Sequence, residues 1–442
     1  MKISRWLAVA VALSLVGPAR AQDEWVGKRV ILKKPGIQIG YSDDTGKQIY
    51  VAELTNLSYS VLADNQGFLR VTHRGVSGWF PKTDALLPDE AIPFFGERAR
   101  LAAPKDSYPF AYLGWAHREK RQFDLAIAAY DAAIKRDPRA DWYNNRGILH
   151  LDIKKLDLAI ADFSEAIKRA PKFVLALENR AATYGLQNKA KLALDDWDEV
   201  LRLDPGNAPA RVRRAKIYID QKQLDKAVAD LSAILKDDPK NIPVLIDRGQ
   251  LYVDLNKADE ALSDFSAALA LDATNAETYL ARAQVFTDKK EFGKALLDAE
   301  EAVRLAPTLS EARVARGWNQ FLKGDFEKAN EDFAKAVEMN PNLPGAYNSQ
   351  AWLWATCPDK KFRSGQKAVE FAAKALKLTQ GKEPTILDTQ AAALAENGDF
   401  DQAVRVQEQV IRAVANTPLA AEAQTRLELY QKKQPHRQAI AK

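Results

Sequence analysis

The sequence contains few residues of the kinds that form reactive or metal sites. Among its 442 residues are one cysteine, Cys357, four histidines and two methionines. A single cysteine cannot form an intrachain disulfide, so packing must stabilise the fold. The histidines lie far apart and are not spaced with cysteine or carboxylate residues as metal ligands are. We therefore predict no metal site.

The common catalytic and phosphate-binding motifs are also missing. The sequence contains no Gly-x-Ser-x-Gly, no Gly-Lys-Ser or Gly-Lys-Thr loop and no His-Glu-x-x-His. Its carboxylates mostly follow helical patterns that place them on solvated faces, so no catalytic pair stands out. We predict a protein that is not an enzyme and has neither catalytic residues nor a cofactor.

Long apolar runs are absent except near the start of the chain. Lys2 and Arg5 precede an apolar run over residues 6–16, and Ala19-Arg20-Ala21 follows it. This order predicts a secretory signal peptide over residues 1–21, cleaved near Ala21. We expect an exported protein, periplasmic or secreted, with no membrane span in the rest of the chain. Removing the three basic residues of the signal lowers the formal charge from +5 to +2, which does not favour nucleic acid as a partner.

Residues 22–88 alternate between apolar and polar residues in short runs separated by turn residues, which predicts β-strands. The expected strands are Arg29–Leu32, Ile37–Gly40, Ile49–Glu53, Tyr59–Ala63, Phe68–Thr72 and Gly78–Pro81. Strands this short and closely spaced predict a small closed β-barrel.

Within this segment, Phe68-Leu69-Arg70-Val71 followed by Gly78-Trp79-Phe80-Pro81 resembles the end of a Src-homology-3-like domain of the bacterial exported type. The resemblance implies that the barrel binds cell-wall peptides or packs against a neighbouring domain. Because side chains alternate along a strand, we expect one of Trp79 and Phe80 to point inward and the other to the surface. Core packing is the favoured role and a ligand platform is the alternative.

A period of 34 residues governs most of the remaining chain. Prolines mark it, spaced by 33, 34, 34, 68 and 34 residues, at Pro138, Pro171, Pro205, Pro239, Pro307 and Pro341. In one unit, Tyr143, Gly147, Ala159 and Phe163 stand at intervals that recur in its neighbours. A fixed period of this length predicts a helical solenoid.

The units resemble the tetratricopeptide repeat, which implies two antiparallel helices per unit, stacked on the next pair. We expect units to begin near Ser107, Ala140, Val174, Ala208, Ile242, Ala276, Ser310, Pro344 and Pro384. The predicted fold is mainly α, a right-handed α-solenoid of about nine tetratricopeptide repeats preceded by a small all-β barrel. A half-repeat helix over 89–106 should link the barrel to a solenoid over 107–417, and a capping helix and a loose polar tail should fill 418–442.

Small residues recur on both helices of a unit and are expected to face each other, so that the helices approach closely. On the first helices they are Gly114, Gly147, Ala181, Ala215, Gly249, Ala283 and Gly317, and on the second Ala126, Ala159, Ala193, Ala227, Ala261, Ala295 and Ala329.

Two columns of opposite charge also follow the period. They are Arg146, Arg180, Arg214, Arg248, Arg282 and Arg316, and Asp162, Asp196, Asp230, Asp264, Asp298 and Asp332. Each residue lies three or four positions from the apolar residues of its helix, beside the packed seam, where a charge needs a partner. We predict a ladder of partly buried Arg–Asp pairs, each within one repeat, that sets the register of the helices. The alternative is two solvated stripes.

Repeat eight departs from the regular pattern. Its helices are joined by a turn five residues longer than in repeat five, over Thr356–Arg363, which contains Cys357. The run from Ala351 to Asp359, with Leu387-Asp388-Thr389 and Asn397-Gly398-Asp399-Phe400, resembles a closing module of exported bacterial tetratricopeptide proteins. We expect Cys357 to be a buried structural residue, with a reactive thiol as the alternative.

The tetratricopeptide resemblance implies that the first helices line a concave face. The positions expected to point into this groove are Tyr112, Trp115, Asn145, Asn179, Arg213, Lys216, Gln250, Gln284, Trp318 and Trp352. Amide side chains can bond to both the donors and the acceptors of an extended peptide. Arg213 and Lys216 are suited to an acidic group, and the tryptophans are flat apolar anchors. The alternative at each position is an ordinary solvated face.

The predicted function is a non-catalytic scaffold that binds an extended peptide or protein segment in the concave groove. In the alternative, the β-barrel binds cell-wall peptide or glycan and the solenoid is a spacer. The expected partner is another protein or peptide, with the cell wall as a second candidate.

Overall fold

The computed structural model describes residues 25–440 except 35, 43–47, 55–57, 66, 74–75, 382, 416 and 418. The predicted signal peptide over 1–21 lies outside the described residues. The chain divides into two compact units, residues 1–210 and 211–442. Among the described helices, none is both long enough and apolar enough to cross a membrane.

The first unit begins with two antiparallel β-sheets, one with strand order β4-β1-β8 and the other β3-β2-β7-β6-β5. The strands are β1 (Arg29–Leu32), β2 (Ile37–Ser42), β3 (Gln48–Leu54), β4 (Ser58–Ser60), β5 (Ala63–Asn65), β6 (Phe68–His73), β7 (Val76–Pro81) and β8 (Ala85–Leu86). Alternation sends Val30, Leu69 and Phe80 into one apolar core, where all three are fully buried. The single strand expected over Tyr59–Ala63 is instead divided, because β4 pairs with β1 and β5 with β6.

Helix α2 (Pro88–Arg100) links the sheets to the first helical pair. Its start is fixed by Pro88 at the first helical position and by Glu90, whose carboxylate accepts a hydrogen bond from the Leu87 backbone N–H at 3.0 Å. The Phe95 ring packs on the Tyr112 ring of the next helix, with centroids 4.9 Å apart.

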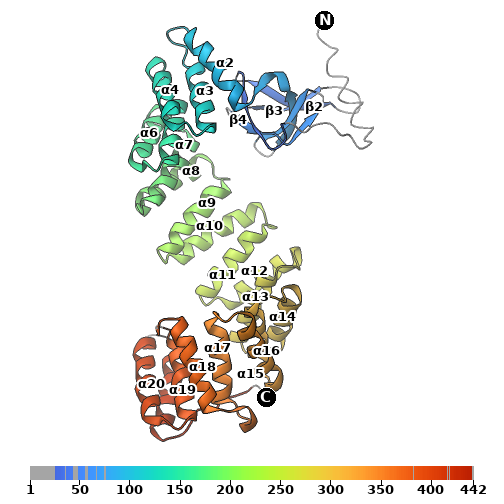
Figure 1. The fold of residues 1–442 in the computed structure, drawn as a ribbon, viewed down its shortest axis with the longest axis vertical. Helices are drawn as coiled ribbons and strands as arrows, with labels where there is room; N and C mark the ends of the chain where they lie inside the picture. Colours follow the sequence, from blue (N-terminus) through green and yellow to red (C-terminus); the bar gives the residue numbers. More distant parts are fainter. Residues whose placement is uncertain are drawn as a thin grey trace. The chain divides into compact units, whose positions relative to one another are not determined.

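Antiparallel helix pairs follow one another through the rest of the chain (Figure 1). In the first unit they are α3 (Tyr108–Glu119), α4 (Phe123–Arg136), α5 (Ala140–Asp152), α6 (Leu156–Arg169), α7 (Val174–Leu186) and α8 (Ala190–Leu203). The division of the chain falls within α9 (Ala208–Asp220). The second unit continues with α10 (Leu224–Asp237), α11 (Ile242–Asp254), α12 (Ala258–Leu271), α13 (Ala276–Asp288), α14 (Phe292–Leu305), α15 (Ser310–Leu322), α16 (Phe326–Met339), α17 (Pro344–Thr356), α18 (Gly365–Leu378), α19 (Pro384–Glu396), α20 (Phe400–Val414) and α21 (Leu419–Gln431).

The helix ends follow from the repeated sequence. Each second helix of the regular repeats that is followed by a proline of the column ends two residues before it, because proline cannot continue the hydrogen-bond ladder. Most first helices end two residues before a residue with positive φ, such as Lys154 (60°), Asn256 (57°) or Gly324 (90°). This left-handed residue closes the helix and turns the chain into the second helix.

Glycines on the first helices face aromatic rings. A methyl group built on Gly249 would lie 2.8 Å from Cε1 of Phe265, and one on Gly317 would lie 2.8 Å from Cε1 of Phe333. The expectation that small residues face small residues is therefore incomplete. At these positions the ring of the residue sixteen positions later fills the space that glycine leaves.

First helices of successive repeats also touch one another. In the second unit α13 contacts α15, α15 contacts α17, and α17 contacts α19. These helices form a continuous surface, and three of the predicted binding positions, Gln284, Trp318 and Trp352, belong to them.

Candidate functional site

The arginine and aspartate columns form bidentate pairs within each repeat. In the pair of Arg248 and Asp264, Nε donates to Oδ2 and Nη2 to Oδ1, both at 2.7 Å. The same two bonds, at 2.5–2.9 Å, join Arg146 to Asp162, Arg180 to Asp196, Arg214 to Asp230, Arg282 to Asp298 and Arg316 to Asp332. The aspartates are 3–6% exposed, so these are not solvated stripes. Hydrogen bonds to Asp264 raise the pKa of Arg248, while burial lowers it.

The third guanidinium nitrogen reaches the preceding repeat, a contact that was not predicted from the sequence. Nη1 of Arg248 donates to Oγ of Ser232 at 2.9 Å, and Nη1 of Arg282 donates to Oγ of Ser266 at 3.1 Å. Each of these arginines, on the first helix of its repeat, therefore hydrogen-bonds to the second helix of the same repeat and to the second helix of the repeat before it.

Repeats eight and nine replace the ladder with other polar contacts. Gln350 stands at the arginine position and donates to Asn330 of the preceding repeat at 2.9 Å. In repeat nine, Asp388 accepts from Gln407 and from Arg426 of α21, both at 2.9 Å. Asp388 and Arg426 are each 8% exposed, so this ion pair is a buried link between the last repeat and its capping helix.

Two predicted groove residues of repeat one are covered. Tyr112 is 4% exposed under Phe95, and Trp115 is half-buried with the Arg29 guanidinium of β1 6.0 Å from its ring centroid. The prediction that these rings point into an open groove is wrong, because α2 and β1 pack on this end of the first unit.

The amides of repeats two and three are brought together. Asn179 donates to Asn144 at 2.9 Å, and Asn144 lies beside Asn145 at 3.5 Å. Asn144 is buried and was not singled out from the sequence. Part of the hydrogen-bonding capacity predicted for a ligand is therefore used between neighbouring repeats.

Arg213, Lys216 and Gln250 are exposed on the first helices of repeats four and five in the second unit. Gln284 is exposed on α13, and its amide donates to Asp288 at 2.8 Å. These four side chains are exposed on the first helices, and their place in a binding groove stays a prediction.

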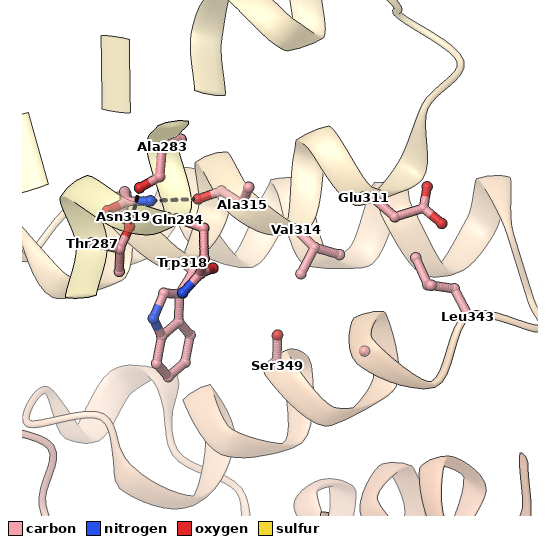
Figure 2. A pocket seen from close by; sticks show the side chains of 11 residues that line it. Ala283, Gln284, Thr287, Glu311, Val314, Ala315, Trp318, Asn319, Leu343 and Ser349 are labelled. Carbon is pink, nitrogen blue, oxygen red and sulfur yellow. Dashed lines mark hydrogen bonds between the residues drawn. The ribbon is translucent and has the colours of Figure 1, made fainter. Parts of the chain in front are cut away.

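A hollow of about 250 Å³ lies across α13, α15 and α17. Its walls include Gln284, Val314, Trp318 and Ser349. Figure 2 shows Val314 and Trp318 pointing from α15 toward α17, and Ser349 pointing back from α17. We call this space the Trp318 hollow.

The polar wall of the Trp318 hollow is fixed by internal hydrogen bonds. Asn319 donates to the Ala315 carbonyl at 2.9 Å, and the Thr287 hydroxyl lies 3.0 Å from the Asn319 amide oxygen (Figure 2). The resulting site pairs a large flat apolar ring with a wall whose buried amide, Asn319, has its hydrogen bonds satisfied within the protein.

A second hollow, of about 320 Å³, lies over α17, α19 and α21. Trp318, Trp352, Asp388, Arg426 and Gln438 contribute to its walls, so Trp318 belongs to both hollows. Trp352 is only 7% exposed. The prediction that its ring is open is wrong because the C-terminal tail, residues 434–440, packs against it, and the expectation that the tail is loose is also wrong.

Cys357 is fully buried at the end of α17, and burial raises the pKa of its thiol. The following loop is held by Arg363, whose Nη1 donates to the carbonyl oxygens of Cys357 and Pro358, both at 2.9 Å. Among the described residues, no group of histidine, cysteine and carboxylate side chains is placed to hold a metal ion.

The fold and the surface of first helices define a helical-repeat protein, and the comparisons identify the repeat. Models of the tetratricopeptide repeat match residues 113–172, 186–246, 246–310 and 310–343. The chain is therefore a tetratricopeptide-repeat protein. No curated protein matches its sequence. Such repeats bind other proteins or peptides, which supports an interaction scaffold.

Solved structures with similar folds include two tetratricopeptide proteins and yeast Tom70. One from Parabacteroides merdae is 21% identical, with 55% of this chain and 96% of that chain covered and a TM-score of 0.38. The C-terminal part of one from Cytophaga hutchinsonii is 18% identical, with 54% and 98% covered and a TM-score of 0.48. Yeast Tom70 is 16% identical, with 74% and 96% covered and a TM-score of 0.40.

Proposed function

We propose that this protein is a non-catalytic scaffold that binds an extended peptide or protein segment on the groove formed by its first helices, with Trp318 as the main anchor. The observation that carries the proposal is the Trp318 hollow, which spans three consecutive first helices and combines an indole with fixed polar groups. Large aromatic residues in such pockets commonly contribute most of the binding energy of an interface.

The test is selection of peptides from a displayed library against the full chain, followed by affinity measurement on variants. We expect Trp318→Ala to weaken the selected peptides by about tenfold or more. Leu297→Ala is the matched control, because Leu297 is an apolar residue, 66% exposed, on the second helix α14. Equal binding by wild type and Trp318→Ala, with both melting at the same temperature, would rule out Trp318 as the anchor.

We further propose that Arg213 and Lys216 bind an acidic group of the partner. Both are exposed on α9. Two basic side chains attract carboxylates, and added salt screens this attraction and shortens its range. Replacing both by alanine should weaken an acidic peptide and flatten the salt dependence of its affinity. Unchanged affinity would exclude the acidic group.

The β-sheets carry an aromatic surface that favours cell-wall binding as a second function. Gly40 of β2 lies in register between Tyr50 of β3 and Trp79 of β7. Tyr50 is 57% exposed and Trp79 half-buried, whereas Phe80 is fully buried. Trp79→Ala should reduce sedimentation of the protein with purified cell wall if this surface binds peptide or glycan, and undiminished sedimentation would exclude it.

We also propose that residues 1–21 direct export to the periplasm or the medium. The order of basic residues, apolar run and Ala19-Arg20-Ala21 supports this. N-terminal sequencing of the protein recovered from the cell envelope or the medium should begin at Gln22, and a start at Met1 would contradict export by cleavage.

A further inference from the structure

The chain reverses direction after its last helix and returns to the surface of first helices. Lys433, with φ of 57°, makes the turn after α21. The tail over 434–440 then runs without helix or strand to α17, and Ile440 reaches Gly324, where a methyl group would lie 3.6 Å from its Cδ1.

The tail binds through its main chain and an aromatic contact. The Gln438 backbone N–H donates to the carbonyl oxygen of Thr356 at 2.9 Å. The Trp352 indole N–H donates to the Gln438 side-chain oxygen at 3.3 Å, and the His436 ring lies 5.8 Å from the Trp352 ring. An extended peptide ligand is held by the same kinds of contact, main-chain hydrogen bonds for affinity and side-chain pockets for selectivity.

The tail also supplies a charge. Nη2 of Arg437 lies 2.7 Å from Oε2 of Glu396, and its Nη1 donates to the Ala355 carbonyl oxygen at 3.3 Å. The Glu396 side chain is 14% exposed and also pairs with Arg363 of the repeat-eight loop at 3.1 Å. A second basic partner stabilises the negative charge of a carboxylate that is this buried. Glu396 therefore favours a cation at this point.

We propose that residues 434–440 are an intramolecular ligand, seated where an external extended peptide with a basic side chain for Glu396 binds once the tail is displaced. The inference rests on the proposed function, because it assigns the first-helix surface to peptides. It adds that the ligand at repeats eight and nine carries a basic side chain. It also adds a regulatory step, in which the ligand competes with the tail.

The position of the tail favours competition over a purely structural role. Gln438 is part of the wall of the second hollow, which shares Trp318 with the first. A peptide seated in the Trp318 hollow that continues toward α19 must therefore meet the tail. Displacement of the tail joins the two hollows into one surface from α13 to α21.

The test uses full-length chains and a fluorescent peptide of residues 433–442. In Arg437→Glu the tail meets Glu396 with like charge and leaves its seat, so the chain should bind the peptide about tenfold or more tightly than wild type does. Lys432→Glu is the matched control, because it makes the same charge change at an exposed residue outside the docked segment. It should bind like wild type. A peptide that itself carries Arg437→Glu should not bind.

A second measurement confirms release of the tail directly. Trypsin should cut after Lys433 faster in Arg437→Glu than in wild type, with helical content unchanged. Equal cleavage, or accelerated cleavage without peptide binding, would overturn the proposal. Binding of the tail peptide needs no external partner and no contact with Gln284 or Val314. The tail peptide can therefore bind even if selected peptides do not depend on Trp318, and selected peptides can depend on Trp318 even if the tail peptide does not bind.

Discussion

The Arg248 guanidinium and the Asp264 carboxylate face each other across one repeat in two parallel hydrogen bonds of 2.7 Å. Since Asp264 is 4% exposed, Asp264→Ala leaves the half-buried Arg248 guanidinium without its anion and should cost about 3 kcal/mol of unfolding free energy. Denaturant titration measures the loss. Glu260→Ala, at an exposed position on the same helix, should change stability by about 0.5 kcal/mol or less. An unmoved midpoint in Asp264→Ala would show that the ladder does not stabilise the fold.

A glycine substitution tests the close approach of the two helices. Gly249→Ala places a methyl group 2.8 Å from Phe265 and should destabilise the protein by about 1–3 kcal/mol, although alanine is the better helix former. Gly293→Ala is the matched control, because nothing lies within 4 Å of its new methyl group. Thermal melting should show opposite signs for the two variants, since the control gains helix propensity alone. Equal shifts would mean that the ring of Phe265 moves aside freely.

The thiol of Cys357 should be slow to react. Its side chain is fully buried and burial raises its pKa, so the reactive thiolate is scarce. A bulky aromatic disulfide should modify the native chain about a hundredfold or more slowly than the urea-unfolded chain, because reaction requires local opening. Absorbance of the released thiolate follows the rate. Similar rates in the two states would identify Cys357 as an accessible, reactive residue.

Docking of the tail should weaken in acid because of His436. Burial and then the positive charges of Arg426 and Arg437 lower the pKa of His436 from an ordinary value of 6.5 to about 4, while Glu422 opposes the shift. The undocked tail binds the proton more readily, so docking is strongest above pH 6.5 and is lost progressively as the pH falls toward 4, by up to about 3 kcal/mol.

Hydrogen exchange of the Gln438 amide, corrected for the intrinsic rate at each pH, measures this loss. His436→Gln is neutral throughout the range and keeps the pair of Arg437 and Glu396, so its protection should vary less between pH 6.5 and 4. An identical pH profile in the variant would assign the effect to other groups.

The period of the sequence was enough to predict the helices and the Arg–Asp ladder. The period predicts these contacts because each regular repeat packs against the same kind of neighbour, so spacing alone places Arg248 opposite Asp264. The third bond of Arg248, to Ser232, follows the same spacing and could have been found by aligning second helices with the arginine column.

The ends of the chain were harder to predict, because their contacts join segments that no period relates. Tyr112 is covered by α2, and Trp352 by a tail 84 residues beyond it at His436. The buried pair of Asp388 and Arg426 likewise belongs to repeat nine and its cap alone. A single irregular sequence does not show which polar residues pair over such separations.

In this part of the solenoid every second repeat carries a glycine that faces an aromatic ring: Gly249 faces Phe265 and Gly317 faces Phe333, while the repeat between them has Ala283 and Ala299. This pattern limits which repeats can be removed or added. Removing residues 257–290 deletes one repeat length between the left-handed residues Asn256 and Lys290, so the turn itself is kept. The deletion places Ala299 where Phe265 stood, opposite Gly249, and leaves a void in place of the ring. Removing 257–324 instead brings Gly249 to Phe333, a pairing that Gly317 already makes. We expect the second deletion to give the more cooperative thermal melt, and the opposite order would contradict this. The natural unit of exchange in this part of the chain is two repeats.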